Sequence, residues 1–249
     1  MATHHTVPPP LVKPVQLRSN WAPLKPGLND LTQTHEAPAQ TSAPESGLSA
    51  TGLACFRGDR QLFRDLNLKV DAGQALQVRG PNGCGKTTLL RILCGLTRPE
   101  DGTIRWRGRV LRSPDPDYLR DLRYIGHNDG VKLVLTPREN LRIAMALDTG
   151  ADEAELESAL ARLDLAQFMD VPCRSLSAGQ RRRVGLARLT LGGGRLWLLD
   201  EPFTALDIDG TGTVRALIEA HLDGGGCAVL TSHQPIGIDA DKSTSIDLI

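Results

Sequence analysis

A glycine-rich segment of the chain has the residue types and spacing of a loop that binds phosphate groups. Residues 80–88 read Gly-Pro-Asn-Gly-Cys-Gly-Lys-Thr-Thr, which matches the pattern G-x-x-x-x-G-K-[ST]. Glycines allow a tight turn whose backbone N–H groups point at a phosphate, and a following helix adds its positive N-terminal end. In such a loop the lysine reaches the β- and γ-phosphates and the first hydroxyl binds Mg²⁺. The segment therefore predicts a site for a nucleoside triphosphate and Mg²⁺ built from Gly80, Pro81, Asn82, Gly83, Cys84, Gly85, Lys86, Thr87 and Thr88.

A second candidate site is an apolar run that ends in two acidic residues. Residues 196–201 read Leu-Trp-Leu-Leu-Asp-Glu. Continuous apolar runs are typical of strands buried on both faces, and ligands of open α/β sheets bind at the carboxyl ends of strands. Alone, the run is equally compatible with a strand followed by two surface acids. Together with the phosphate loop, it predicts that Asp200 holds Mg²⁺ and that Glu201 polarises an attacking water.

Cys84 lies inside the phosphate loop, where the helix that follows would favour a reactive thiolate. We expect it to be alkylated rapidly and protected by ATP, although a small residue merely tolerated in the loop is the alternative. The five cysteines are scattered and contain no C-x-x-C pair. They are typical of reduced thiols rather than of a disulfide framework or a zinc site.

Composition sets limits on the partners of the chain. Lys+Arg and Asp+Glu number 29 each, so no bulk charge indicates nucleic acid or an anionic membrane surface. No apolar run reaches the length of about 18 residues that a membrane span needs. The first residues also lack the basic and then apolar pattern of a secretory signal.

The elements that position these residues follow from the pattern along the chain. Residues 1–47 are rich in Pro, Thr, Ser and Gln, and we expect a disordered extension there. Residues 48–249 alternate strand and helix patterns, which is typical of an α/β domain. Strands are predicted at 66–70, 74–79, 103–107, 120–125 and 196–201, and a helix at 88–93 that Gly95 closes. Amphipathic helices are predicted at 137–147 and 152–163, within a helical insert at about 128–190.

Three further segments form a pattern with the phosphate loop and the acidic pair. Residues 176–180 read Leu-Ser-Ala-Gly-Gln, residues 204–207 read Thr-Ala-Leu-Asp, and residues 229–233 read Val-Leu-Thr-Ser-His. Three arginines follow the first of them, and such a run is more often solvated or structural than a nucleic-acid site. With the phosphate loop and the acidic pair, this order resembles the ATP-binding-cassette (ABC) ATPases over residues 48–249.

The resemblance implies an α/β fold: a P-loop NTPase core of ABC type with a mostly parallel sheet, an antiparallel β subdomain and a helical insert. It implies a homodimer in which Ser177, Gly179 and Gln180 contact the γ-phosphate of ATP held by the other subunit. Ala178 replaces a glycine of the family pattern. It also implies that Asp207 lies at the dimer interface. The lone histidine, His233, would then contact the γ-phosphate and orient Glu201 and water.

Two positions depart from the family pattern. His127 stands where the family has a glutamine. A histidine there would still reach Mg²⁺ or water, and it would make hydrolysis depend on pH. The aromatic residue that stacks on adenine is shifted by one position, so that either Phe56 or Arg57 would stack on the base.

Residues 121–132, 135–141, 170–184 and 195–207 resemble more narrowly the ATP-binding subunits of cytochrome c maturation heme exporters. That resemblance implies a peripheral ATPase on the cytoplasmic face of the bacterial inner membrane. Its partners would be integral membrane heme-exporter subunits and, indirectly, a periplasmic heme chaperone that ATP hydrolysis releases, with no nucleic acid. Two alternatives remain open: the ATPase of another small-cargo exporter, and a soluble ABC protein acting on nucleic acid or ribosomes. Proteins of the second kind usually carry two cassettes or a long coiled-coil insert, and this sequence shows neither.

Overall fold

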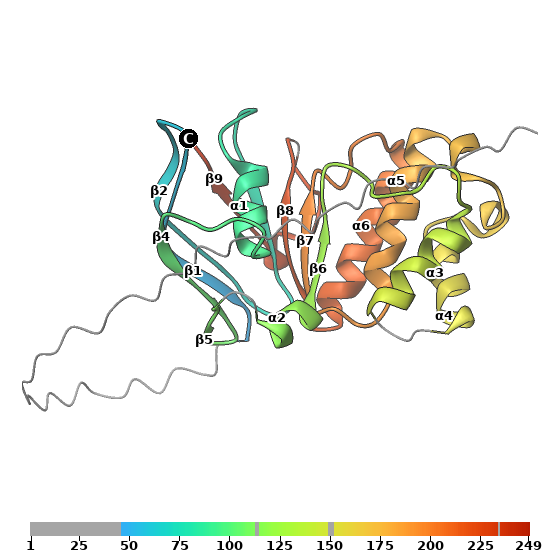
Figure 1. The fold of residues 1–249 in the computed structure, drawn as a ribbon, viewed down its shortest axis with the longest axis horizontal. Helices are drawn as coiled ribbons and strands as arrows, with labels where there is room; N and C mark the ends of the chain where they lie inside the picture. Colours follow the sequence, from blue (N-terminus) through green and yellow to red (C-terminus); the bar gives the residue numbers. More distant parts are fainter. Residues whose placement is uncertain (1–45, 113–114, 149–151, 234) are drawn as a thin grey trace, which may run out of the picture. The chain divides into compact units, whose positions relative to one another are not determined.

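A computed structural model describes residues 46–112, 115–148, 152–233 and 235–249. The predicted disordered extension, residues 1–47, lies outside these ranges except for its last two residues. Within them the chain forms one antiparallel sheet, one parallel sheet and a set of helices (Figure 1). None of the helices in these ranges has the length and apolar composition that a membrane span requires.

The antiparallel sheet has the strand order β2-β1-β4-β5. Its strands are β1 (Leu48–Arg57), β2 (Arg60–Val70), β4 (Asp101–Trp106) and β5 (Arg109–Val110). The register of β1 against β2 and β4 shifts after Ala50 and Thr51, where Gly52 adopts a φ of 65°. A glycine in this left-handed conformation interrupts the alternation of the strand.

The parallel sheet has the order β6-β7-β8-β3-β9. Its strands are β3 (Ala75–Arg79), β6 (Leu122–Ile125), β7 (Leu196–Asp200), β8 (Cys227–Thr231) and β9 (Ser243–Asp247). Every pairing among them is parallel. Strands β7 and β8 are buried along their whole length, as expected for apolar strands covered on both faces.

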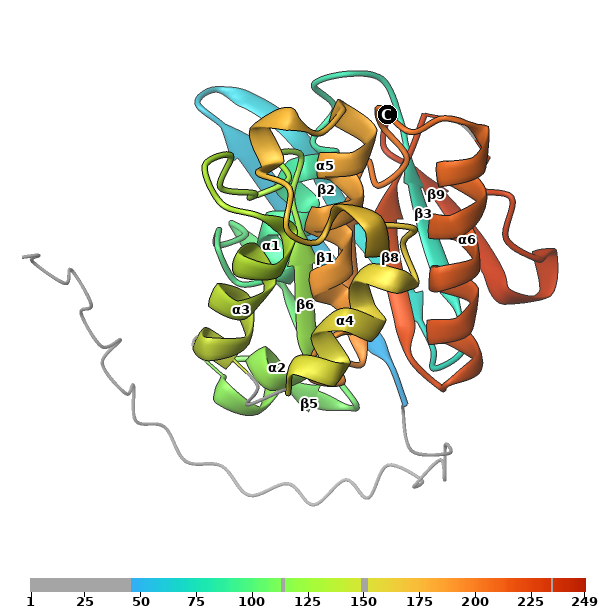
Figure 2. The same cartoon turned by 90° about the vertical axis from the view of Figure 1, so that its right-hand side faces the viewer.

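Alternate residues of the parallel sheet face two separate cores. Leu196 and Leu198 belong to a core that includes helix α1 (Lys86–Leu93) and the antiparallel sheet. Trp197 and Leu199 belong to the core formed with the helices on the other face. Those helices are α3 (Pro137–Asp148), α4 (Glu153–Ala161), α5 (Ala178–Ala187) and α6 (Ile208–Asp223). Figure 2 shows α6 in front of the parallel strands and α1 behind them.

This architecture confirms the predicted α/β fold, with its mostly parallel sheet and its separate antiparallel sheet. The two predicted amphipathic helices are also confirmed, as α3 and α4. The predicted strand at 120–125 is too long, because Arg120 and Asp121 belong to helix α2 (Pro116–Asp121). Asp115 caps that helix through bonds from two backbone N–H groups. Helix α5 ends at Ala187, and a short 3-10 turn, Arg188–Thr190, follows it.

Candidate functional site

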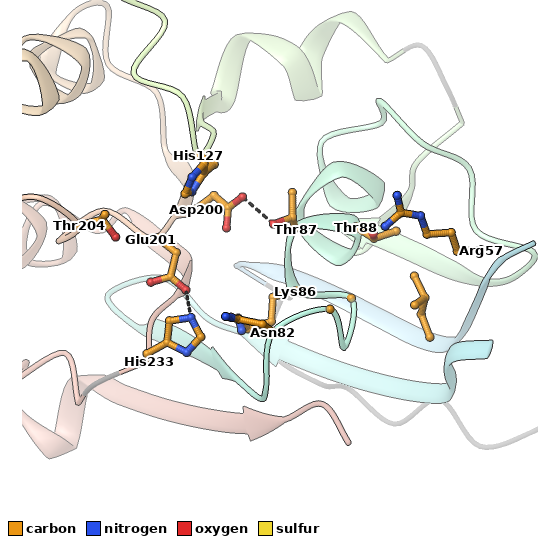
Figure 3. Close-up of a pocket in the computed structure, with 13 residues that line it drawn as sticks. Arg57, Asn82, Lys86, Thr87, Thr88, His127, Asp200, Glu201, Thr204 and His233 are labelled. Atoms are coloured by element: carbon orange, nitrogen blue, oxygen red, sulfur yellow. Dashed lines mark hydrogen bonds and ion pairs between the residues drawn. The ribbon is translucent and has the colours of Figure 1, made fainter. Parts of the chain in front are cut away.

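Many of the predicted site residues, although not those at 177–180 or Asp207, come together at the carboxyl edge of the parallel sheet. The phosphate loop follows β3, the segment with His127 follows β6, Glu201 follows β7, and His233 follows β8. They surround a cavity of about 380 Å³, drawn in Figure 3. The cavity is lined by Arg57, Leu62, Asn82, Gly83, Gly85, Lys86, Thr87, Thr88, His127, Asp200, Glu201, Thr204 and His233.

The phosphate loop owes its shape to three glycines in the left-handed half of backbone space. Gly80, Gly83 and Gly85 have φ values of 144°, 80° and 112°, which other residues rarely adopt. A side chain at Gly85 would also approach the ring of Phe63 to 3.3 Å. Lys86 Nζ donates to the carbonyls of Gly80 at 2.7 Å and Pro81 at 3.3 Å. The lysine thus lies over its own loop, at the position where phosphate oxygens would compete for its protons.

Asp200 is fixed by two hydroxyl groups, one from helix α1 and one from strand β8. Its Oδ2 accepts from Thr87 Oγ1 at 2.8 Å, and its Oδ1 accepts from Thr231 Oγ1 at 2.7 Å. The carboxylate has only 1% of its surface exposed. Carboxylate and hydroxyl oxygens are ligands that Mg²⁺ accepts in proteins. The pair Thr87 and Asp200 therefore fits a magnesium ion, as the sequence pattern predicts.

Glu201 occupies a strained turn immediately after β7. Its φ is 51°, a conformation that is uncommon for any residue except glycine. Its backbone N–H donates to Thr231 Oγ1 at 2.8 Å. His233 Nε2 lies 3.2 Å from Glu201 Oε1, as the dashed line in Figure 3 marks. Among the described residues, Oε1 is buried and has no partner with hydrogen-bond geometry, so His233 is the polar group that lies beside this oxygen.

The other polar residues of the lining include His127, whose exposed side chain borders the cavity. Arg57 also lines it, whereas Phe56, which is 42% exposed, is not among the described lining residues. Of the two candidates for adenine contact, the cavity therefore favours Arg57. Leu62 and Thr204 line the cavity as well; sequence reasoning did not single out Leu62 and named Thr204 only as part of the segment at 204–207.

Cys84 differs from its expected environment. Its side chain has 6% of its surface exposed and belongs to the core beneath the antiparallel sheet. The Cβ that a side chain at Gly80 would add lies 2.7 Å from Cys84 Sγ. The thiol is therefore packed against the back of the loop, and this burial argues against the rapid alkylation expected from the sequence.

Burial also acts on Tyr124, which precedes the loop with His127. Desolvation, followed by the charge of Asp200, raises the pKa of its phenol above the ordinary value. Tyr124 is therefore a neutral hydroxyl at physiological pH and adds no charge beside Asp200.

The segment at 176–180 begins helix α5. Ser177 and Gln180 form a reciprocal cap, in which Gln180 N donates to Ser177 Oγ at 3.1 Å and Ser177 N donates to Gln180 Oε1 at 2.8 Å. A side chain at Gly179 would meet the carbonyl of Ala205 at 2.8 Å, so α5 starts in contact with the turn before Asp207. Asp207 in turn caps α6 by accepting from Gly210 N. Among the described residues, the cavity lining includes none of Ser177, Gly179, Gln180 and Asp207.

Sequence reasoning missed the role of one arginine in the run after Gln180. Arg182 is 3% exposed, and its guanidinium donates to the backbone carbonyls of Asp200 and Glu201 at 2.8 and 2.9 Å. A charge run on a helix normally indicates a solvated face, and only the fold shows that the middle arginine points inward.

Comparison with known proteins agrees with this geometry. A family model described as ABC transporter matches residues 63–204. The cytochrome c biogenesis ATP-binding export protein CcmA of Methylococcus capsulatus is 51% identical over 198 residues, which cover 79% of this chain and 96% of that protein. The protein of the same name from Nitrosococcus oceani is 51% identical over 199 residues, covering 80% and 91%. An ABC transporter ATP-binding protein of Pyrococcus furiosus superimposes with a TM-score of 0.70 at 22% identity, over 81% of this chain and 96% of that one.

Proposed function

This chain belongs to the ABC transporter family, and on that basis we propose that it is the ATP-hydrolysing subunit of a heme exporter that serves cytochrome c maturation. The observation that carries the proposal is the high identity to export proteins of cytochrome c biogenesis over nearly their whole length. The matched family region includes the phosphate loop, the segment at 176–180 and the acidic pair. Nucleotide binding and ATP hydrolysis follow from membership of the family.

Hydrolysis requires a water molecule placed in line with the γ-phosphate and polarised by a base. Glu201 suits the role of base, because it is among the described residues that line the cavity and its buried Oε1 lies beside His233. His233, 3.2 Å from that oxygen, would orient the carboxylate and contact the γ-phosphate. The strained turn at Glu201 holds the base in one direction before ATP arrives.

Charge in the cavity is arranged for the phosphates of ATP. Lys86 would exchange its two loop carbonyls for phosphate oxygens, which bind an ammonium group more strongly than neutral carbonyls do. Thr87 and Asp200 would hold Mg²⁺, which offsets the negative charge of the phosphates when bound. His127, which lines the same cavity as Asp200 and is drawn in Figure 3, would reach the ion or its water.

We further propose that two copies of the chain close around two ATP molecules. Ser177, Gly179 and Gln180 start a helix whose positive N-terminal end suits an anion, and they lie outside the described lining of the cavity in their own chain. A second copy would supply its own α5 start to the γ-phosphate held here. Asp207, at the exposed start of α6, would lie in the same interface.

The partners of this dimer would be integral membrane subunits of the exporter, with the ATPase on the cytoplasmic face of the inner membrane. Closure of the dimer on ATP would be transmitted to those subunits, because ATP binds the closed form in preference. In this scheme hydrolysis releases a heme-loaded periplasmic chaperone, and the ATPase itself does not contact heme.

The test is to replace the wild-type protein by the Glu201→Gln variant in the cells that produce it. We expect the variant to bind ATP, to lose hydrolysis and to abolish covalent heme attachment to c-type cytochromes, measured by heme staining. Purification of the variant from native membranes with ATP should recover membrane subunits of cytochrome c biogenesis. A matched control is Glu155→Gln on the exposed face of α4, which makes the same chemical change away from the cavity.

The outcomes separate the alternatives. If c-type cytochromes are normal and a different membrane subunit is recovered, the chain is still an exporter ATPase, but its cargo is not heme. Recovery of ribosomes or nucleic acid would contradict the assignment as an exporter subunit and would favour a soluble ABC protein. Full ATP turnover by Glu201→Gln would show that another group is the base.

A further inference from the structure

Arg182 is a buried cation that the chemistry described above does not use. It lies on α5, two residues beyond Gln180, and 3% of its surface is exposed. A buried guanidinium needs partners for its donors. Nη2 finds them in the backbone carbonyls of Asp200 at 2.8 Å and Glu201 at 2.9 Å, which are the two residues of the acidic pair.

The other arm of the guanidinium binds the loop that carries His127. Nη1 donates to the carbonyl of Gly126 at 3.1 Å and to Asp129 Oδ1 at 3.0 Å. Asp129 also balances the charge, since the two side chains form an ion pair. Arg182 thus joins the segments before and after His127 to the turn that carries Glu201.

Close packing holds α5 against the same loop. A side chain at Gly185, one helical turn beyond Arg182, would meet the carbonyl of Asp129 at 2.7 Å. The helix backbone therefore lies directly on the loop, which leaves Arg182 little freedom to move. A planar guanidinium presents donors in two directions at once, so neither lysine nor glutamine would bridge both segments.

The turn at Glu201 depends on this bridge. Its φ of 51° is uncommon and persists only when surrounding bonds determine it. The amide on one side of the Cα is held by Thr231 Oγ1, and the carbonyl on the other side is held by Arg182. Together the two bonds fix the direction in which the Glu201 side chain leaves the backbone.

We propose that Arg182 is a positioning residue for ATP hydrolysis, which aims Glu201 at the attacking water and couples it to the loop that carries His127. The inference rests on the proposed role of Glu201 as base. Arg182 is not among the described residues that line the cavity. It therefore acts on the rate of the chemical step and not on nucleotide binding.

The test uses Arg182→Gln in the full chain. Misplacing a catalytic group by about 1 Å costs on the order of 100-fold in rate, so we expect kcat to fall between about 10- and 100-fold. The Kd for ATP, measured by calorimetry, should change less than about threefold, because Arg182 is not among the described residues that line the cavity. A loss confined to kcat would indicate an interaction that is made in the transition state. Arg182→Lys keeps the positive charge but lacks the planar guanidinium, and it should lower kcat by a smaller factor.

Arg183→Gln is the matched control. Arg183 is the next residue of the helix and donates to the carbonyl of Leu163 and to Asp164, both in the helical insert. It should leave kcat within about twofold of the wild type, since it touches no group of the cavity. Equal losses of kcat in the two variants would overturn the proposal, as would a parallel loss of ATP affinity and melting temperature in Arg182→Gln and Arg182→Lys.

A double variant separates this inference from the function on which it rests. If Arg182 acts through Glu201, Arg182→Gln should not lower the residual hydrolysis of Glu201→Gln any further. The same fold-loss in both backgrounds would show that Arg182 acts independently and would overturn the proposal. Unimpaired turnover by Glu201→Gln alone would instead refute the assignment of the base.

Discussion

At the scale of single residues, hydroxyl groups organise the site as much as charges do. Thr231 is fully buried, donates to Asp200 Oδ1 and accepts from the backbone N–H of Glu201. One hydroxyl thus connects the proposed magnesium ligand with the proposed base. Because a hydroxyl both donates and accepts, it makes two bonds at a position where a methyl group would make none.

Thr231→Val keeps the shape of the side chain and removes both bonds. We expect it to lower the free energy of unfolding by about 1–3 kcal/mol, because a buried carboxylate oxygen and a buried amide lose their partners. ATPase turnover should fall as well. Thr231→Ser, which keeps the hydroxyl, is the control; equal effects of the two substitutions, compared by chemical denaturation and steady-state hydrolysis, would contradict the prediction.

His221 predicts a pH dependence of stability. Its ring stacks on Trp197 with 3.8 Å between centroids, and burial lowers its pKa from 6.5 to about 4. The unfolded chain therefore binds more protons between these two values, so stability is full above about pH 6.5 and declines as the pH falls towards 4. Because a tenfold difference in proton affinity between the folded and unfolded chain is worth about 1.4 kcal/mol, the loss amounts to about 3 kcal/mol.

His221→Phe keeps the stacked ring and removes the titration. We expect the decline in unfolding free energy between pH 6.5 and 4 to be shallower in the variant than in the wild type. Urea denaturation at several pH values measures this slope. An identical slope in both proteins would assign the acid sensitivity to other groups.

At the scale of elements, α5 joins the parts of the site because glycines let it approach two loops. Gly179 lies against Ala205 and Gly185 lies against Asp129. A Cβ at either glycine would be only 2.8 or 2.7 Å from the backbone carbonyl oxygen of that neighbour. Gly212 of α6, by contrast, has no atom within 4 Å of that position. A methyl group at Gly185 of α5 would therefore clash with a neighbouring loop, whereas one at Gly212 of α6 would not.

Gly185→Ala should destabilise the protein, because the new methyl group forces α5 away from the loop at Asp129 and overpacking costs about 1–3 kcal/mol. Gly212→Ala should stabilise it by about 0.5–1 kcal/mol, since alanine favours a helix over glycine. Thermal unfolding of the two variants beside the wild type checks the opposite signs. A stabilising Gly185→Ala would show that the loop yields easily.

Elements with strong local signals were predictable from the sequence, and those that depend on distant partners were not. Helices α3 and α4 show apolar periodicity, and β7 is a continuous apolar run. Helix α2 was missed although Asp115 and Pro116 are a start signal, because it is only six residues long. Arg182 could not be recognised, since all but one of its described partners are backbone carbonyls, which carry no mark in the sequence, and the other, Asp129, lies in a distant segment.

At the scale of the whole molecule, the proposed dimer predicts that two inactive variants restore each other. Lys86→Ala should lose ATP affinity, because it removes the charge on the phosphates. Ser177→Glu should place a like charge against ATP held by the second copy. A mixed dimer of the two then contains one intact site, formed by Lys86 of one copy and Ser177 of the other.

Half of the dimers in an equal mixture are mixed, and each has one site of two intact. We therefore expect the mixture to recover up to about a quarter of wild-type turnover if the sites work independently, whereas each variant alone stays inactive. Subunits are exchanged by incubation without nucleotide before the assay. A mixture as inactive as its components would contradict a site shared between copies.

The strand order of the parallel sheet also has a consequence for synthesis on the ribosome. Strand β3, which carries the phosphate loop, lies between β8 and β9, two strands that are made much later. At about 5–20 residues per second, the nascent loop waits on the order of ten seconds for its first neighbour in the sheet. A growing chain therefore has the phosphate-binding residues long before it has the scaffold that shapes them. The described lining of the cavity extends to His233, so we expect a nascent chain to capture ATP only after β8 has been translated, and nucleotide binding then reports that the sheet around the loop has formed.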